Sequence, residues 1–226
     1  MTKILILGAG STSQEIAEIL IEQARQGAAT QLLGFLDDDA HARGLPDLGV
    51  RVIGSTDQAY RFPDTHFVMG IAGYTNPKLR KQICERLGLA PDRYYTVVHP
   101  SAEVSPSASL GPGCVLMQKV IIGRGVRLNN NVLVTQGCFI GHDSAVDQFA
   151  VFAPNVTVCG LSRIGESVYF GAGSTSAPGV EIGSESLIGI GSVVLQSVQP
   201  GCTVFGNPAR IIQSTANQRW NPRGRG

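Results

Sequence analysis

The sequence of 226 residues has little charge, few aromatic residues and no long apolar run. Charged residues make up 15% of it and the net charge is +1, so no basic surface is predicted and nucleic acid is disfavoured as a partner. The apolar run nearest the start, Ile4 to Leu7, is too short for a membrane span or a signal peptide. The chain is nevertheless 43% hydrophobic, which predicts a globular protein with a core of its own.

Cysteine is also scarce, and its spacing indicates no pairing. The five cysteines are odd in number and form no CxxC motif: Cys84, Cys114, Cys138, Cys159 and Cys202. This pattern argues against a disulfide framework and predicts a reducing, cytoplasmic compartment.

What the sequence has instead is a six-residue repeat from Val104 to Val194. Every sixth residue in this stretch is Val, Ile, Leu or Phe, with Ser176 as the exception. The residue two places before each of them is small or β-branched. A period of six fits neither an α-helix nor a strand alone, and it is typical of a hexapeptide-repeat parallel β-helix. In the left-handed form three hexads close one triangular coil, so we expect about five coils.

The repeat also predicts a role for each position. The large residue points into the coil, and the small residue lets neighbouring walls close. Glycine often follows the large residue, and we expect it to supply an unusual turn dihedral. These glycines are Gly111, Gly123, Gly141, Gly165, Gly171, Gly183 and Gly189. Because most of the repeat is scaffold, function must come from positions that break the pattern.

The part before the repeat alternates apolar strands with amphipathic helices. The predicted strands and helices cover 3–7, 13–26, 31–36, 50–53, 66–71 and 76–87. This order predicts a small parallel sheet in a Rossmann-like α/β domain, with about half the strands of a full dinucleotide-binding domain. We therefore expect two domains: a Rossmann-like domain over 1–98, and an all-β left-handed parallel β-helix with a closing strand and tail over 99–226.

A glycine turn, Gly8-Ala9-Gly10-Ser11-Thr12-Ser13, joins the first strand to the first helix. The backbone N–H groups and the dipole of such a helix start favour an anion such as phosphate. Ser13 replaces the third glycine of the dinucleotide fingerprint, so an ordinary tight turn is the alternative. Asp37 and Asp38 follow the second strand, where carboxylates accept hydrogen bonds from ribose; a solvated acidic turn is the alternative.

Only one of the four histidines, His142, lies inside the repeat. It comes two places after the inward Ile140, which predicts an outward corner position, and Asp143 follows it. A neutral imidazole facing a groove can accept a proton, and an adjacent carboxylate can orient it. Gly160 lies about one coil of eighteen residues later, where its N–H could bind an oxyanion. A solvated His-Asp pair is the alternative. No metal site is predicted: hexapeptide-repeat carbonic anhydrases need three histidines, and this repeat contains only His142.

Taken in order, the motifs resemble the NeuD-type family of bacterial sugar O- and N-acyltransferases over nearly the whole chain. The similar segments are Ile4-Leu-Ile-Leu-Gly-Ala-Gly10, Gly34-Phe-Leu-Asp-Asp-Asp39, Asn76-Pro-Lys-Leu-Arg80, His99-Pro-Ser-Ala102, His142-Asp143 with Ala153-Pro154 and Cys159-Gly160, and Gly206-Asn-Pro-Ala-Arg210. The resemblance implies a homotrimer that uses acetyl-CoA to acetylate a nucleotide-linked amino-sugar.

The resemblance also implies a role for each candidate residue. His142 would be the general base in a direct transfer, Asp143 would tune it, and Gly160 would hold the thioester oxygen. The CoA arm would run past three residues on later coils, Ala172, Ala177 and Ile190. The phosphates of the nucleotide sugar would meet Gly10, Ser11 and Thr12, and its nucleoside would meet Asp37 and Asp38.

The chain departs from the family pattern in three places. It has Ser11-Thr12-Ser13 where the family often has Gly-His-Gly, Gly141 in place of an acidic residue, and Val151 in place of a second histidine. These departures leave the sugar and the acyl donor open. Two alternatives to the acetyl-CoA enzyme stay open: another acyl donor such as an acyl-carrier protein, and a non-catalytic nucleotide-sugar-binding trimer. The glycine turn and Asp37 also suggest a nicotinamide dehydrogenase, but the small first domain and the attached β-helix argue against it.

Overall fold

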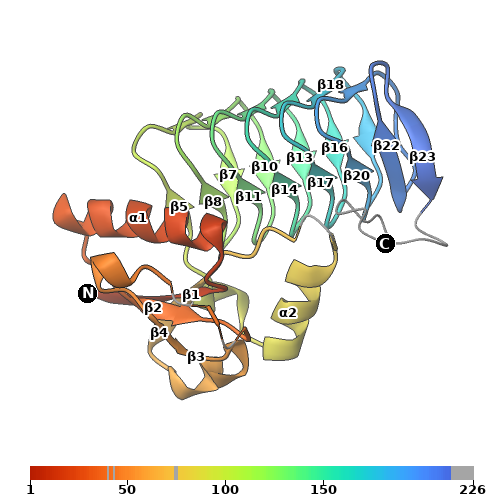
Figure 1. Ribbon diagram of the computed structural model, residues 1–226. Helices are drawn as coiled ribbons and strands as arrows, with labels where there is room; N and C mark the ends of the chain where they lie inside the picture. The colour runs from red at the N-terminus through yellow and green to blue at the C-terminus, as the bar shows by residue number, and fades with distance from the viewer. Residues whose placement is uncertain (40, 43, 74–75, 215–226) are drawn as a thin grey trace.

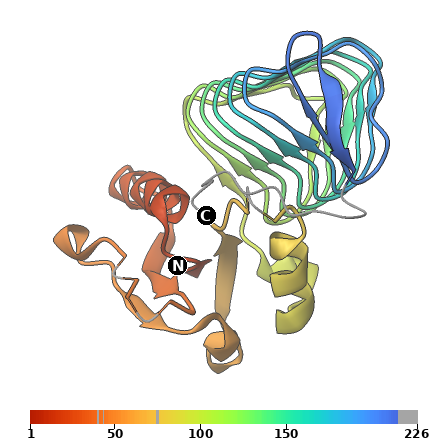
Figure 2. The ribbon, with the colours of Figure 1, turned by 45° about the vertical axis from the view of Figure 1, so that its right-hand side comes forward.

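The computed structural model describes residues 1–39, 41–42, 44–73 and 76–214. It consists of a small α/β domain beside a long prism of stacked coils (Figure 1). Figure 2 looks more nearly along the prism and shows its three-sided cross-section. The predicted fold class is confirmed: an α/β domain is followed by a left-handed parallel β-helix.

The α/β domain is built on a four-stranded parallel sheet in the order β3-β2-β1-β4. Its strands are β1 (Thr2–Leu7), β2 (Thr30–Leu36), β3 (Val52–Gly54) and β4 (Thr65–Met69). The strand β1 lies inside the sheet, so the side chains of Ile4 to Leu7 are buried on both faces. The helix α1 (Ser11–Arg25) packs on one face, whereas α2 (Leu79–Leu87) packs on the other. Three short 3-10 helices complete the domain: Pro46–Leu48, Thr56–Arg61 and Pro91–Arg93.

The helices differ from the prediction mainly at their starts. Helix α1 begins at Ser11 because Gly10 already has the extended backbone of an N-cap residue. Helix α2 begins at Leu79, three residues after the predicted start, because Asn76 forms a turn of its own. The Asn76 side chain accepts a hydrogen bond from the Lys78 N–H at 3.1 Å, and its carbonyl accepts one from the Leu79 N–H at 3.0 Å. Helix α2 ends at Leu87, as predicted, and Gly88 follows it with a left-handed φ of 60°.

The prism has three sheets, here named after their first strands. The β5 sheet contains β5 (Val97–Val98), β8 (Val115–Leu116), β11 (Leu133–Val134), β14 (Val151–Phe152), β17 (Tyr169–Phe170), β20 (Leu187–Ile188), β22 (Cys202–Phe205) and β23 (Arg210–Ser214). The β6 sheet contains β6 (Glu103–Val104), β9 (Ile121–Ile122), β12 (Phe139–Ile140), β15 (Thr157–Val158), β18 (Thr175–Ser176) and β21 (Val193–Val194). The β7 sheet contains β7 (Ser109–Leu110), β10 (Arg127–Leu128), β13 (Ala145–Val146), β16 (Arg163–Ile164) and β19 (Glu181–Ile182).

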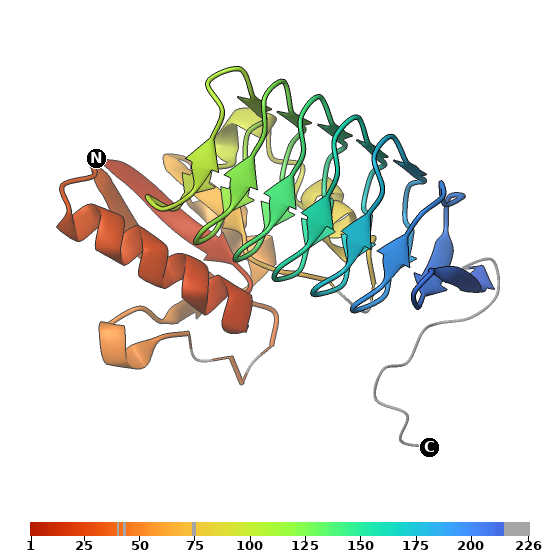
Figure 3. The same cartoon turned by 90° about the horizontal axis from the view of Figure 1, so that it is seen from above.

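The register of these strands repeats every coil without a slip. Phe139 lies opposite Thr157, and Val146 lies opposite Ile164. The large residues of the repeat fill the interior together with the small ones, as predicted; for example, the rings of Phe152 and Phe170 stack with their centroids 5.2 Å apart. Figure 3 shows the coils in succession up to the β22–β23 hairpin, which closes the C-terminal end.

The role predicted for the glycines after the large positions is wrong. None of the seven has a left-handed φ; that conformation occurs two places later, for example at Gly125 (67°) and Asp143 (56°). The glycines are needed for space instead. A Cβ added at Gly141 would lie 2.5 Å from the backbone nitrogen of Gly160 in the next coil. Glycine after the large residue therefore allows successive coils to approach, while the turn dihedral is carried by another position.

The α/β domain lies on the outer surface of the β5 sheet. The outward side chains of Val115, Leu133 and Val151 are buried in one cluster with residues of α1 such as Ile16 and Leu20. Since this apolar contact is continuous with the core of the domain, the two parts form one packed unit.

Polar contacts from α2 reinforce this interface. Arg80 is fully buried, and its guanidinium donates to the carbonyls of Met69 (3.1 Å), Ile71 and Asn131 (2.7 Å), so it links the end of β4 to the prism. Burial lowers the pKa of Arg80 to about 10.

Two ion pairs also join this segment to the prism: Lys78, the N-cap residue of α2, pairs with Glu185 at 2.6 Å, and Lys81 of α2 pairs with Glu166 at 2.5 Å. Burial by itself raises the pKa of Glu166, but hydrogen bonds from Lys81 and Gln148 outweigh it and hold that pKa below its ordinary value. Within the described ranges, no helix is long and apolar enough to cross a membrane.

Candidate active site

His142 lies in the turn between β12 and β13, at the corner where the β6 and β7 sheets meet. We call the turn residues 141–143, 159–161 and 177–179 the His142 corner. The imidazole projects outward with 59% of the side chain exposed, whereas its neighbour along the chain, Ile140, is fully buried in the coil. The corner position predicted for His142 is therefore correct, and the ring is available to a ligand.

Asp143 holds the imidazole from the side. Its Oδ2 lies 3.0 Å from Nδ1 of His142 and also accepts a hydrogen bond from Nη2 of Arg124 at 2.8 Å. The hydrogen bond with His142, followed by the charges of Arg124 and Arg127, lowers the pKa of Asp143 below its ordinary value. An ionised Asp143 accepts from Nδ1–H, which leaves the lone pair of the neutral imidazole on Nε2, beside Gly160.

Gly160 stacks directly on the imidazole, as the one-coil spacing predicts. A Cβ added at Gly160 would lie 2.7 Å from Nε2 and 2.8 Å from Cδ2 of His142, so no larger residue fits there without moving the ring. The hydrogen bonds of the described residues give the Gly160 N–H no acceptor. The structure thus brings a base, a carboxylate and a backbone donor together on one corner.

The other residues predicted along the CoA arm fall into two groups. Ala177 follows β18 and belongs to the His142 corner. Ala172 and Ile190 lie instead at the corner between the β5 and β6 sheets, where the Ala172 carbonyl accepts a hydrogen bond from the Gly191 N–H at 2.9 Å. Ile190 is 69% exposed. Within one chain these two residues are not beside His142.

The glycine turn of the α/β domain has the geometry expected of an anion site. Gly10 is the N-cap of α1 and Ser11 and Thr12 are its first residues, with no side chain hydrogen-bonded to the helix start. Asp37 contacts this turn: its Oδ2 accepts a hydrogen bond from the Ala9 N–H at 2.6 Å. The structure therefore brings Asp37 next to the predicted phosphate-binding residues.

Asp38 has structural partners. Its carboxylate accepts hydrogen bonds from the backbone N–H and hydroxyl of Thr56 at 2.8 and 2.7 Å, and it pairs with Arg86 at 3.0 Å. Burial raises the pKa of Asp38, but the bonds from Thr56 and Arg86 dominate and lower it. Asp38 joins the end of β2 to the 3-10 helix Thr56–Arg61 and to α2, and any contact with a nucleoside would compete with these bonds.

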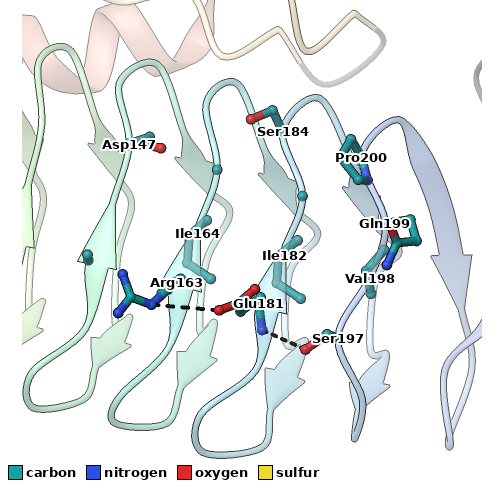
Figure 4. A pocket seen from close by; sticks show the side chains of 13 residues that line it. Asp147, Arg163, Ile164, Glu181, Ile182, Ser184, Ser197, Val198, Gln199 and Pro200 are labelled. Atoms are coloured by element: carbon teal, nitrogen blue, oxygen red, sulfur yellow. Dashed lines mark hydrogen bonds and ion pairs between the residues drawn. The ribbon is translucent and has the colours of Figure 1, made fainter.

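Two features near His142 were not predicted from the sequence. Arg124 occupies the equivalent place one coil earlier, a position that the eighteen-residue spacing identifies. The second is a hollow of about 410 Å³ on the β7 sheet, which begins at Ala145, directly after the His142 turn, and ends at Pro200 (Figure 4). Arg163 and Glu181 form an ion pair at 3.7 Å across it. The small Ala145 between larger outward residues was the only available signal.

The described part of the chain contains no group of three or more His, Cys, Asp or Glu side chains arranged to hold a metal ion. The groups that the His142 corner presents are an exposed imidazole, a carboxylate and backbone donors.

Comparison with known proteins yields matches over both domains. Residues 3–87 match the family described as PglD N-terminal domain. The acetyltransferase domain of PglB from Neisseria gonorrhoeae, solved in complex with acetyl coenzyme A, is 31% identical with a TM-score of 0.80; the match covers 93% of this chain and 98% of that one. A histidine-to-asparagine mutant of perosamine N-acetyltransferase from Caulobacter crescentus, solved with CoA and GDP-perosamine, is 25% identical with a TM-score of 0.79; the match covers 94% and 98%.

Among curated sequences, the UDP-N-acetylbacillosamine N-acetyltransferase of Bacillus subtilis is 34% identical over 125 residues, which is 52% of this chain and 52% of that protein. Serine acetyltransferases match over a similar part. The chain spans 41–52% of the length of these curated relatives.

Proposed function

Because this chain belongs to the NeuD-type family of sugar acyltransferases, we propose that it transfers an acetyl group from acetyl-CoA to the amine, or a hydroxyl, of a nucleotide-linked sugar. The relatives support this substrate class, since one was solved with acetyl coenzyme A and another with CoA and GDP-perosamine. The observation that carries the proposal is the stacking of Gly160 on a histidine whose Nδ1 is held by Asp143.

In the proposed reaction, Nε2 of His142 accepts a proton from the sugar amine while the amine nitrogen bonds to the thioester carbon. The electron pair of the thioester C=O moves to its oxygen, and the Gly160 N–H stabilises the resulting oxyanion. The carbonyl then re-forms as the C–S bond breaks, and the CoA sulfur receives the proton held by His142. Asp143 stabilises the transient imidazolium, and no covalent acyl-enzyme is needed.

We propose a homotrimer because of where the two candidate sites lie. In a three-sided prism, the corner between the β6 and β7 sheets is opposite the β5 sheet, and the β5 sheet carries the α/β domain. A sugar bound by that domain is therefore separated from His142 of its own chain by the width of the prism. In our proposal His142 serves a sugar that a neighbouring copy holds.

The positions of the residues proposed to contact acetyl-CoA also require two copies of the chain. Ala177 shares a corner with His142, but Ala172 and Ile190 lie along a different one. In the proposed assembly, acetyl-CoA lies between two prisms and meets Ala177 and Gly160 of one copy and Ala172 and Ile190 of the next. The exposure of Ile190 supports this, because a contact with a second copy or with CoA would cover it.

For the nucleotide sugar, we propose that the N–H groups of Gly10, Ser11 and Thr12 bind its phosphates and that Asp37 and Asp38 lie beside its nucleoside. The contact from Asp37 to the turn supports the first part, because it fixes the turn that presents these groups.

All five cysteines are free, and we propose a cytoplasmic location, where thiols stay reduced.

The test is thiol release from acetyl-CoA with a panel of UDP-, GDP- and dTDP-linked amino-sugars. We expect turnover with one of them and a loss of about a hundredfold in His142→Ala. His99→Ala is the control: that ring contacts Ser101 in the first coil of the prism, at the β5–β6 corner but several coils before Ala172 and Ile190. Release from an acyl-carrier protein alone would point to a different donor. Binding of a sugar without any turnover would contradict catalysis and favour a sensor role.

The assembly has its own test. Light scattering should give three times the mass of the chain. His142→Ala and Ser11→Asp chains should each be inactive, and mixed trimers of the two should regain activity because one copy supplies His142 and its neighbour the phosphate site. Mixing restores nothing if each chain carries a complete site.

A further inference from the structure

Arg124 holds Asp143 at both its backbone and its side chain. The Arg124 carbonyl accepts a hydrogen bond from the Asp143 N–H at 2.7 Å. Its Nη2 donates to Oδ2 of Asp143 at 2.8 Å, and this is the oxygen that faces Nδ1 of His142 at 3.0 Å. One carboxylate oxygen is therefore shared between the guanidinium and the imidazole.

The backbone around Asp143 supports the same arrangement. Asp143 has a left-handed φ of 56°, and its other oxygen, Oδ1, lies 2.4 Å from where a Cβ of Gly125 would be. Gly125 is itself left-handed, with a φ of 67°. The carboxylate thus lies over a glycine of the previous coil, between the side chains of Arg124 and His142, and has little freedom to turn.

We propose that Arg124 is a positioning residue: it fixes the Asp143 carboxylate so that Oδ2 accepts from Nδ1–H of His142 and Nε2 stays free for the substrate proton. The catalytic consequence rests on the function proposed above, but the effect on the imidazole does not. The charged groups that face Asp143 are Arg124, Arg127 and, when protonated, His142. Of these arginines, only Arg124 has a hydrogen bond to Asp143 in the structure.

The first test is the tautomer of neutral His142, read from the ¹⁵N shifts of its ring in the full-length protein, with His142→Ala used for assignment. We expect the Nδ1–H form to dominate in the wild type and both forms to be populated in Arg124→Gln. Arg124→Lys should recover part of the effect. Arg127→Gln removes a nearby charge without removing a hydrogen bond, and it should leave the tautomer unchanged.

The second test separates positioning from charge in the enzyme reaction. At a pH where His142 is neutral in both proteins, we expect Arg124→Gln to lower kcat/KM about fivefold, because the base is less well oriented. Arg127→Gln should stay within about twofold of the wild type. A change that acts only through the protonated fraction of His142 would disappear at that pH, and Arg127→Gln controls for the loss of a nearby positive charge.

The proposal is overturned if Arg124→Gln keeps the wild-type tautomer, or if it matches Arg127→Gln in both tautomer and rate. If no sugar is acetylated, the proposed function fails, yet the tautomer measurement still decides whether Arg124 orients the pair.

Discussion

Replacement of Gly160 by alanine is predicted to remove activity without weakening the fold. The new methyl group would lie 2.7, 2.8 and 3.0 Å from Nε2, Cδ2 and Cε1 of His142. Carbon atoms in contact normally stay about 3.5–4.0 Å apart, so the ring must move by about 1 Å. The imidazole is largely exposed and can swing into solvent, so the methyl group displaces the ring and leaves the coil intact.

The effects of Gly160→Ala on the free energy of unfolding and on the reaction rate differ greatly in size. Loss of the His142–Asp143 hydrogen bond costs about 0.5–1.5 kcal/mol. Alanine in place of glycine returns about 0.4–1 kcal/mol by restricting the unfolded chain, because the φ of Gly160 is not left-handed. The free energy of unfolding should therefore change by less than about 1 kcal/mol, and Tm by less than about 3 °C. A general base displaced by about 1 Å loses about a hundredfold in rate.

The assay is kcat/KM for acetyl transfer beside a thermal unfolding curve. A double-mutant cycle with His142→Ala isolates the cause: in that background, Gly160→Ala should have little further effect, because both changes act through the same ring. Wild-type activity in Gly160→Ala would refute the stacking argument. A fall in Tm of more than about 5 °C would mean that the coil, and not the ring, gives way.

Three further changes test the scaffold around the site. Gly141→Ala would place its Cβ 2.5 Å from the backbone nitrogen of Gly160, so a coil must shift, and Tm should fall by about 5 °C or more, unlike in Gly160→Ala. Arg80→Met leaves three buried carbonyls without their donor and should cost about 3–5 kcal/mol, seen as a Tm lower by about 10 °C. The pKa of Glu166 is depressed in the folded protein, so its pairing with Lys81 stabilises the protein above the ordinary value of 4.5 and is lost as the pH falls. The Tm of Glu166→Gln should accordingly be about 2 °C below the wild type at neutral pH, and this difference should shrink as the pH falls below 4.5 through the lowered folded pKa; an unchanged difference at low pH would contradict this assignment.

The fold of the repeat was predictable because every hexad imposes the same physical requirement, so the signal recurs many times along the chain. A large inward residue at every sixth place, such as Ile140 or Phe152, can be satisfied only by a coil of fixed width, so the fold and the outward position of His142 both follow. The stacking of Gly160 on His142 followed from the same spacing. By contrast, the start of α2 depends on one side chain, Asn76, whose local hydrogen bond competes with helix formation. Such a preference is too weak to be read without the structure.

The wrong prediction that the glycines after the large residues supply the turn dihedral has a different cause. Left-handed φ and close backbone approach both favour glycine, and the sequence gives no means of telling one from the other. In this prism the two requirements lie two residues apart: Gly123 allows the next coil to approach, while Gly125 has the left-handed turn. Glycine is not required at the left-handed position. One coil after Gly125, Asp143 occupies the equivalent position with a φ of 56°.

The position of Asp143 shows how the repeat produces a site. A side chain in the left-handed position lies over the glycine of the previous coil, so its orientation is set by the stacking and not by a separate loop. An aspartate there faces the residue before it in the turn, which is His142, and the residue one coil below that, which is Arg124. The His–Asp pair and its arginine are therefore neighbours because of the coil spacing alone. Any β-helix with His-Asp at such a turn, and a glycine in the next coil against the imidazole ring, should bring the imidazole, the carboxylate and the backbone N–H together without an inserted loop.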